Sequence, residues 1–271
     1  MSESIIVVKL GGTDGVDFSA ICRDAAELIR NGQKLVFIHG GSAEANALGD
    51  AVGYPPKFIT SPSGYSSRYT DRKTLEIFLM AVNGKVNSLL VEQLQMLGIN
   101  GFGLCGLDGR LMVAVRKDSI QSIENGKRKI IRDDYTGKIE NVNFEILNYL
   151  INEGYLPVIA PVAVSLQGEA LNVDADRAAA MIAASIKADT LILLTAVPGL
   201  LKNFPDENSL INILPATQLS SALEMAQGRM KKKILGAEEA LTNGVGKVII
   251  ADGRISNPIT SALSGKGTTI Q

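Results

Sequence analysis

The sequence has little of three residue types on which many enzymes depend, with one histidine, two cysteines and no tryptophan in 271 residues. A Ser-His-Asp triad or a metal site built on histidines would have to use His39, so both kinds of site are disfavoured. Cys22 and Cys105 are far apart and form no CxxC pair, which argues against a disulfide framework or a thiolate metal site. Reduced cysteines are typical of the cytoplasm, where we expect this protein to work.

The chain also lacks an excess of charge of either sign. Lys and Arg number 27 and Asp and Glu number 28, which gives a formal net charge of −1. No overall field therefore favours nucleic acid or a membrane surface as a partner. The first residues pass directly into the apolar run SIIVVKL, with no basic leader and no apolar segment of membrane-spanning length. We expect a soluble protein that binds neither nucleic acid nor membrane.

Short runs rich in Val and Ile alternate with helical patterns along most of the chain. Such runs are typical of buried parallel strands, and helices between them cover both faces of a sheet. The sequence therefore predicts an α/β fold, a three-layer α/β/α sandwich with a mainly parallel central sheet. We expect strands at 4–10, 34–40, 155–164, 190–197 and 247–253, and helices near 17–31, 42–52, 71–97, 142–153, 174–187, 215–225 and 229–243.

The middle of the chain departs from this alternation. Residues 111–117 and 119–134 are predicted to form antiparallel strands, with a type I′ turn at Asn125-Gly126. We interpret this segment as a β-hairpin excursion from one continuous domain, residues 1–271. The stretch GFGLCG (101–106) matches G-x-G-x-x-G, but a helical segment precedes it and a strand-like one follows. A dinucleotide site needs the reverse context, so we reject one, and no P-loop motif is present.

Glycine-rich loops follow the first two predicted strands. In open parallel sheets, ligands bind beyond the carboxyl ends of strands, where backbone N–H groups are exposed. One such loop alone would more simply be a tight turn between strand and helix. Two of them in the same half of the chain favour an anion-binding site. The residues concerned are Lys9, Gly11, Gly12, Gly40, Gly41 and Ser42.

A third candidate lies at the acidic start of the predicted helix 174–187. Asp174 is expected to cap this helix. Asp176 shares the face of Ala179, Ala180 and Ala183, a small-residue face that we expect to be buried. A buried carboxylate without a partner is costly, so a cation should meet Asp176.

The expected cation lies in GRMKKK (228–233). An apolar stripe runs along the predicted helix 229–243 through Met230, Ile234 and Ala237. Lys233 lies at the edge of that stripe, whereas the two lysines before it project away. Helical spacing therefore selects Lys233 as the inward-facing lysine.

Two inward lysines, glycine-rich amide loops and one organising carboxylate suit phosphoryl transfer, which needs positioning and charge neutralisation rather than covalent help. No histidine is available as a general base. A hydroxyl acceptor would normally need one, whereas a carboxylate is already ionised at neutral pH. The pattern favours a carboxylate acceptor and an acyl phosphate product.

The motifs VKLGG, HGGS, SRYTD, LNVDAD, LTAVPGLL and GRMKKK occur in an order and spacing that resemble the amino acid kinase family over essentially the whole chain. The likeness is greatest to the acetylglutamate kinase branch. Within it, HGGSAEAN, SPSGYSSRYTDRKTLEIF, GLDGRL and DYTGKIENVN look like the enzymes of lysine biosynthesis that phosphorylate aminoadipate. In those enzymes the substrate is linked to LysW, a small acidic carrier protein. The resemblance implies the amino acid kinase fold and ATP, with Mg²⁺ held mainly by the ATP phosphates and by no protein metal site.

The resemblance also implies roles for individual residues. Lys9 and Lys233 would stabilise the transferring phosphoryl group, and Asp176 would orient both lysines. Substrate would be bound by Gly40, Gly41, Ser42, Arg68 and Asn172. ATP would be bound by Lys9, Gly11, Gly12, Thr195, Val197, Gly199, Leu200, Gly228, Met230 and Lys233. Residues 1–170 would then form the half for amino-acid substrate and dimerisation, and 171–271 mainly the ATP half.

The sequence departs from the family pattern at three positions. Ser42 stands where a third glycine is common, Asp174 where Asn is common, and Ala196 where Asp is common. The last departure puts one adenosine-side contact in doubt. The resemblance further implies a homodimer without the N-terminal helix used by arginine-inhibited hexamers.

Three functions stay open at this point. The first is a kinase for carrier-linked aminoadipate, with small residues at 61–67 as an open mouth beside Arg68. The basic stretch NGKRKIIR (125–132) would then steer an acidic carrier, or would simply be a solvated hairpin tip. The second is the same chemistry on N-acetylglutamate or carrier-linked glutamate, in arginine biosynthesis. The third, a sensor without activity, is disfavoured by Lys9, Asp176 and Lys233.

Overall fold

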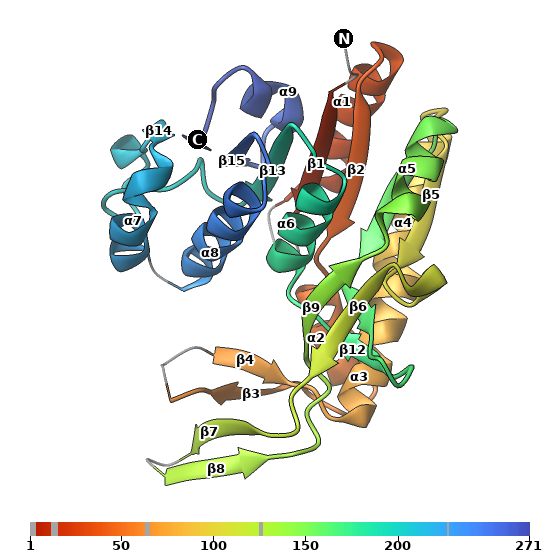
Figure 1. The fold of residues 1–271 in the computed structure, drawn as a ribbon, viewed down its shortest axis with the longest axis vertical. Coiled ribbons are helices and arrows are strands. Elements are labelled where there is room, and N and C mark those ends of the chain that lie inside the picture. The colour runs from red at the N-terminus through yellow and green to blue at the C-terminus, as the bar shows by residue number, and fades with distance from the viewer. Residues whose placement is uncertain (1–3, 12–15, 63–65, 125–126, 227) are drawn as a thin grey trace.

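The computed structural model describes residues 4–11, 16–62, 66–124, 127–226 and 228–271. Within these residues the main sheet has eight strands in the order β14-β16-β15-β13-β1-β2-β10-β5 (Figure 1). All neighbours are parallel except β15 and β16. The predicted, mainly parallel sheet is confirmed. Its strands are β1 (Ile5–Leu10), β2 (Lys34–His39), β5 (Gly101–Cys105), β10 (Leu156–Ala160), β13 (Thr190–Thr195), β14 (Ile213–Leu214), β15 (Lys247–Asp252) and β16 (Thr268–Ile270).

Helices cover both faces of this sheet, as predicted. Successive residues of β1 enter opposite cores, because side chains alternate along a strand: Val7 joins one core, and Ile6 and Val8 join the other. On the face of Val7 lie α5 (Phe144–Asn152), α6 (Ala175–Ser185) and α8 (Arg229–Thr242). On the face of Ile6 and Val8 lie α1 (Phe18–Arg30), α4 (Ser88–Met96) and α9 (Pro258–Leu263).

One strand prediction was wrong, and the strand β5 was missed. Residues 155–164 are two strands rather than one, because β10 ends at Ala160 and β11 (Val162–Val164) belongs to another sheet. Pro161 lies between them, and a proline cannot donate to a strand ladder. GFGLC (101–105), for which no strand was predicted, is the edge strand β5. Its glycines reduced the strand signal, and they lie inside a strand, which agrees with rejecting a dinucleotide loop.

The second sheet has the order β12-β11-β6-β9. In it, β6 (Met112–Arg116) pairs antiparallel with β9 (Gly137–Val142), and β11 pairs antiparallel with β12 (Ala170–Asn172). The sheet brings Asn172, at the end of β12, to the start of α6. The segment 111–117 is therefore a strand as predicted, with β9 as its antiparallel partner.

The third sheet has the order β4-β3-β7-β8 and projects away from the main sheet at the bottom of Figure 1. The predicted antiparallel hairpin is β7 (Ile120–Glu124) with β8 (Lys127–Ile131); its turn, Asn125-Gly126, lies outside the described residues. No strand was predicted near the expected mouth at 61–67, yet Ser66–Tyr69 is strand β4 and pairs with β3 (Lys57–Thr60). Both strands are short, and β3 is largely exposed, so they lack the apolar alternation by which strands are predicted.

The remaining long helix runs from Arg72 to Met96 and is the one helix, among the described residues, with the length and apolar content to cross a membrane. Half of its apolar window, of mean hydropathy 1.2, is buried inside the protein, which is typical of a core helix. It widens into a π-helix in its middle turns. Its parts are α3 (Arg72–Leu79), the π-helix η1 (Met80–Asn87) and α4; α2 (Ser42–Ala51), α7 (Leu219–Met225) and the short turns η2 (Asp108–Arg110), η3 (Glu207–Ser209) and η4 (Ala216–Gln218) complete the helices described.

Candidate active site

The candidate site lies at the carboxyl edge of the main sheet, where the order of the strands reverses. From β1 the sheet extends through β2 on one side and through β13 on the other. The strands are in register, with Lys9 opposite Ile38 and Leu193. The loops that follow β1, β2 and β13 therefore begin side by side. Such a switch point is where open α/β sheets bind their ligands.

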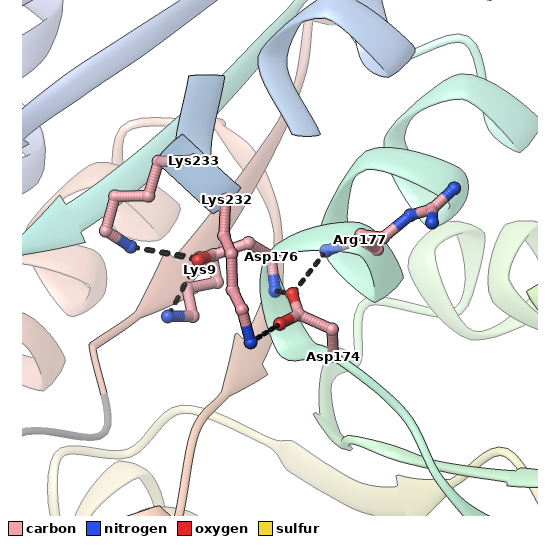
Figure 2. A network of polar contacts seen from close by, with 6 residues as sticks. All are labelled: Lys9, Asp174, Asp176, Arg177, Lys232 and Lys233. Atoms are coloured by element: carbon pink, nitrogen blue, oxygen red, sulfur yellow. Dashed lines mark hydrogen bonds and ion pairs between the residues drawn. The ribbon is translucent and has the colours of Figure 1, made fainter. Parts of the chain in front are cut away.

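Three charged side chains meet at this edge, as Figure 2 shows. Lys9 Nζ lies 2.9 Å from Asp176 Oδ1, and Lys233 Nζ lies 3.0 Å from the same oxygen. Lys233 Nζ is also 3.3 Å from Oδ2. The three side chains are only 7–10% exposed. The cation expected beside Asp176 is present, and there are two.

The environment of this cluster, which we call the Lys9–Asp176–Lys233 triad, keeps the carboxylate ionised. Burial alone would raise the pKa of Asp176, but the charges of Lys233 and Lys9 outweigh burial and hold that pKa well below its ordinary value. Burial, with help from the charge of Lys9 and against the pull of Asp176, lowers the pKa of Lys233 to about 8. Two ammonium groups against one carboxylate leave the triad with an excess positive charge in a buried place. An anion at this point would balance it.

Neighbouring contacts hold α6 and α8 together around the triad. Asp174 caps α6 as predicted, and its Oδ1 accepts the N–H groups of Asp176 and Arg177 at 3.0 and 3.2 Å. Its other oxygen lies 3.4 Å from Lys232 Nζ, so Lys232 points away from the triad but has a partner (Figure 2). Arg177 also reaches Glu239 of α8 through two hydrogen bonds of 2.9 and 2.7 Å. This fixes the spacing between the helices that carry Asp176 and Lys233.

The glycine loops lie next to this cluster. Gly40 N donates to the Leu10 carbonyl at 3.1 Å, which joins the loop after β2 to the end of β1. Gly41 is the last residue before α2, and a Cβ there would lie 2.5 Å from Val82 Cγ1. A Cβ at Gly11 would lie 3.0 Å from the Leu194 carbonyl oxygen. Both positions therefore need glycine for close packing. Gly12 lies outside the described residues.

Three of the residues predicted to bind substrate, Ser42, Arg68 and Asn172, are connected through one chain of contacts. Arg68 lies on β4, is 9% exposed, and donates to the Ser42 carbonyl at 3.2 Å. Thr70 Oγ1 donates to the Arg68 carbonyl and accepts from Asn172 Nδ2 at 3.1 Å. Burial lowers the pKa of Arg68, and no carboxylate pairs with it among the described residues. Ser42 and Asn172 are thus both linked to Arg68, whose buried guanidinium has no counterion in the part of the chain that the structure describes.

Sequence reasoning missed one residue that builds this region, Asp134. Asp134 is 3% exposed and accepts the N–H groups of Thr70 and Thr136 at 3.0 and 2.9 Å. It therefore fixes Thr70 beside Asn172. A buried aspartate is recognisable only from its partners, and Thr70 lies 64 residues before Asp134 in the sequence.

The residues predicted for ATP occupy two places. Thr195 ends β13, and the half-buried Val197 follows in the next loop. Gly199 and Leu200 pack against β16, where Leu200 N donates to Thr268 Oγ1 at 2.8 Å and its side chain is 1% exposed. Its carbonyl accepts from Ile211 N at 2.9 Å, so both backbone polar groups of Leu200 already have partners inside the protein. Gly228 immediately precedes α8 with a φ of 51°, and Met230 lies half-buried in the first turn.

A profile described as the amino acid kinase family matches residues 4–252. This chain belongs to the amino acid kinase family. A relative from Deinococcus radiodurans named "[LysW]-aminoadipate kinase" is 55% identical, covering 98% of this chain and 91% of the relative. A second, from Thermus thermophilus and with the same name, is 50% identical over 98% and 100% of the two chains. A "[LysW]-aminoadipate/[LysW]-glutamate kinase" from Sulfolobus acidocaldarius is 37% identical over 98% and 100%.

Solved structures place this amino acid kinase in the same fold. N-acetylglutamate synthase from Neisseria gonorrhoeae, complexed with coenzyme A and N-acetyl-glutamate, superposes with a TM-score of 0.80 at 25% identity, covering 98% of this chain and 59% of that one. Carbamate kinase from Giardia lamblia bound to AMP-PNP superposes with a TM-score of 0.69 at 15% identity, covering 99% and 98%. The predicted fold class is confirmed. The chain is an ATP-dependent phosphotransferase, as the names of its kinase relatives support.

Proposed function

We propose that this amino acid kinase transfers the γ-phosphoryl group of ATP to the distal carboxylate of 2-aminoadipate, whose amino group is linked to a LysW-like carrier protein. The observation that carries the substrate assignment is the near-full-length similarity to two relatives that bear this activity in their names. Lysine biosynthesis is the corresponding pathway. The triad supports the reaction class, because it gathers excess positive charge where a phosphoryl group would be transferred.

The proposed reaction needs no general base. An ionised carboxylate oxygen of the substrate attacks the γ-phosphorus, the bond from that phosphorus to the bridging oxygen breaks, and ADP leaves. The product is an acyl phosphate, and no proton is transferred. Lys9 and Lys233 would stabilise the negative charge on the moving group. Asp176 would hold both ammonium groups in place, within 2.9–3.0 Å of its Oδ1.

The amino-acid part of the substrate would lie between the loop after β2 and the end of β12. Arg68 supports this placement because its buried guanidinium carries five N–H donors, more than the bond to Ser42 uses. A carboxylate accepts two of these donors at once. Asn172 would hold the amide of the blocked amino group, and Gly40 and Gly41 would supply backbone N–H groups.

ATP would lie on the other side of the triad, mainly on residues 171–271, beside Thr195, Val197, Gly199, Leu200, Gly228 and Met230. Residues 1–170 would form the substrate half.

Among the described residues, no group of three His, Cys, Asp or Glu side chains could hold a metal, and both carboxylates at the site already have cationic partners. Because these carboxylates are already paired with lysines, Mg²⁺ would be held by the nucleotide phosphates, as is usual for that ion. When bound, Mg²⁺ would neutralise charge on the β- and γ-phosphates.

A cavity of about 580 Å³, lined in part by Asp174 and Arg177 at the start of α6, would accommodate part of a carrier-linked substrate. It lies between the third sheet, β9 and the start of α6, and Ser61 and Ser67 form part of its wall. Ser63, Gly64 and Tyr65, also part of the predicted mouth, lie outside the described residues. The neighbouring strand β8 exposes Lys127 and Arg128. We propose that an acidic carrier docks against this basic strand.

We further propose that the kinase is a cytoplasmic homodimer that binds neither nucleic acid nor membrane. The near-zero net charge supports the absence of nucleic-acid and membrane-surface binding.

Carrier-linked glutamate is a second candidate substrate, because the Sulfolobus relative bears both names. One methylene in a pocket is worth only about 1–3 kcal/mol, so the two acceptors would differ modestly.

An ATP-dependent hydroxamate assay tests this function. Purified enzyme would be offered carrier-linked aminoadipate, carrier-linked glutamate and free N-acetylglutamate at equal concentrations. We expect the highest kcat/KM for carrier-linked aminoadipate and slower turnover of the free substrate. Faster turnover of N-acetylglutamate would overturn the carrier assignment. No turnover of any of the three would overturn the enzymatic function.

A further inference from the structure

The one histidine of the chain is buried beside the glycine loop and has no place in the reaction above. His39 is the last residue of β2 and is 0% exposed. Its Nδ1 lies 2.9 Å from the carbonyl oxygen of Gly40, and its Nε2 lies 3.1 Å from Asn87 Nδ2. Both ring nitrogens therefore have partners inside the protein.

These partners decide which nitrogen carries the proton. Asn87 Nδ2 is also 2.8 Å from the Val158 carbonyl oxygen. A carbonyl only accepts, so the Asn87 atom facing it must be the amide nitrogen, and a flipped amide is excluded. The second hydrogen of that nitrogen points to His39 Nε2, which must accept. The proton of the neutral ring is then on Nδ1 and is donated to Gly40. Burial lowers the pKa of His39 to about 4, so the ring stays neutral at physiological pH.

The hydrogen bond from His39 fixes the peptide between Gly40 and Gly41. In a trans peptide, the carbonyl and the following N–H point in opposite directions. With the Gly40 carbonyl held by His39, the Gly41 N–H points away from the ring. Gly40 N is held as well, by the Leu10 carbonyl at 3.1 Å. Two glycines would otherwise allow many orientations of this peptide.

The π-helical turns of the long helix place Asn87 beside His39. Asn87 is the last residue of the π-helix η1 and is 6% exposed. A Cβ at Gly103 would lie 2.2 Å from Asn87 Oδ1, so only glycine in β5 leaves room for the amide. π-Helical turns are rare and occur frequently at functional sites. A buried amide is costly unless it is used.

We propose that His39, held in its Nδ1–H form by Asn87, is a positioning residue that orients the Gly40–Gly41 peptide so that the Gly41 N–H faces the anionic group bound at the start of α2. The proposal rests on the proposed function, which places substrate and phosphate at this loop. His39 takes no proton from substrate and donates none. It acts through the peptide that it holds.

A measurement on the unaltered protein tests the tautomer. Because the chain has one histidine, protein labelled with ¹⁵N in that residue gives one pair of ring-nitrogen signals. We expect a protonated Nδ1 and an unprotonated Nε2, unchanged between about pH 5 and pH 9. A proton on Nε2, or titration near the ordinary histidine pKa of about 6.5, would overturn the proposal. This measurement needs no substrate, so it is independent of the assay for function.

A pair of variants tests the role. In His39→Asn the side-chain amide nitrogen takes about the place of Nδ1 and keeps the bond to Gly40. In His39→Gln the amide takes about the place of Nε2 and keeps the contact with Asn87 only. We expect kcat of His39→Gln to be at least about tenfold below that of His39→Asn, with KM for ATP within about threefold. Equal losses in both variants would mean that the ring only fills space, and the positioning role would be wrong.

Thermal denaturation of both variants separates folding from positioning. Comparable midpoints are expected, since each variant loses one hydrogen bond of the ring. If one variant does not fold, the kinetic comparison moves to Asn87→Leu, in which Nε2 loses its donor. There we expect a signal of Nε2–H to appear together with a fall in kcat. If no Nε2–H signal appears and kcat does not fall, the proposal is overturned.

Discussion

The triad and the third sheet handle charge in opposite ways. The triad places two ammonium groups within 2.9–3.3 Å of one carboxylate, at side chains 7–10% exposed, so that the surplus charge is positive. The third sheet carries Lys127 and Arg128 on an exposed strand that projects from the body of the protein (Figure 1). Water screens charges of the second kind and hardly those of the first. We infer that the buried charges drive the chemistry and the exposed charges attract the carrier.

The largest expected effect separates two adjacent lysines. Lys233→Ala removes a buried ammonium from the triad and should lower kcat by about 10²–10³-fold. Lys232→Ala is the matched control, because that lysine pairs with the half-exposed Asp174, and kcat should change by less than about threefold. Steady-state kinetics of both variants measures the difference. Similar kcat values for the two would contradict the assignment of Lys233.

The second effect is a pH dependence with opposite signs for activity and stability. Since the pKa of Lys233 is lowered to about 8, kcat/KM should fall by about tenfold per pH unit above that value. Bound phosphate should raise this pKa, so the decline of kcat should begin at higher pH. An alkaline limb that persists unchanged in Lys233→Arg would assign it to another group.

Stability should move the other way in the same window. Between about 8 and the ordinary value of 10.5, the unfolded chain holds a proton on Lys233 that the folded protein has lost. Unfolding then takes up a proton, so the contribution of Lys233 to the unfolding free energy rises with pH. The difference between wild type and Lys233→Met in urea denaturation measures that contribution. A difference that falls with pH would show the sign to be wrong.

The third effect concerns the exposed strand. Lys127→Glu combined with Arg128→Glu should raise KM for the carrier-linked substrate by about tenfold and leave kcat on free N-acetylated substrate unchanged. The increase should shrink as salt is added. The matched control, Lys187→Glu with Lys266→Glu, makes the same charge change at exposed positions outside the third sheet. If the control raises KM equally, net charge rather than the strand attracts the carrier.

The smallest effect concerns Asp174. Asp174→Ala removes the cap of α6 and its contact with Lys232. The unfolding free energy should fall by about 1 kcal/mol. Asp174→Asn keeps the cap and should restore most of it. Chemical denaturation of the three proteins compares them; an equal loss in both variants would show that charge, rather than capping, is what matters.

Hydrophobic periodicity predicted the features that depend on a single strand or helix. The inward position of Lys233 and the buried face of Asp176 followed from helical spacing, and their contact was found. Their roles, like those of the substrate and ATP residues, stay predictions. The strands β3 and β4 were missed because they are held by pairing with each other and with β7. The bond of Arg68 to the Ser42 carbonyl depends on that pairing, and so no local pattern contains it.

The strand order also determines when the enzyme becomes complete during its synthesis. Strand β1 is made first and pairs on one side with β2, yet its other side pairs with β13, which begins at Thr190. Until that segment leaves the ribosome, β1 would keep an unpaired, apolar edge, the kind of surface that promotes aggregation. Lys9 would also lack its partners during synthesis, because Asp176 and Lys233 follow much later in the chain. A nascent chain of this kinase can therefore complete the Lys9–Asp176–Lys233 triad only after β13 has become available to cover the edge of β1.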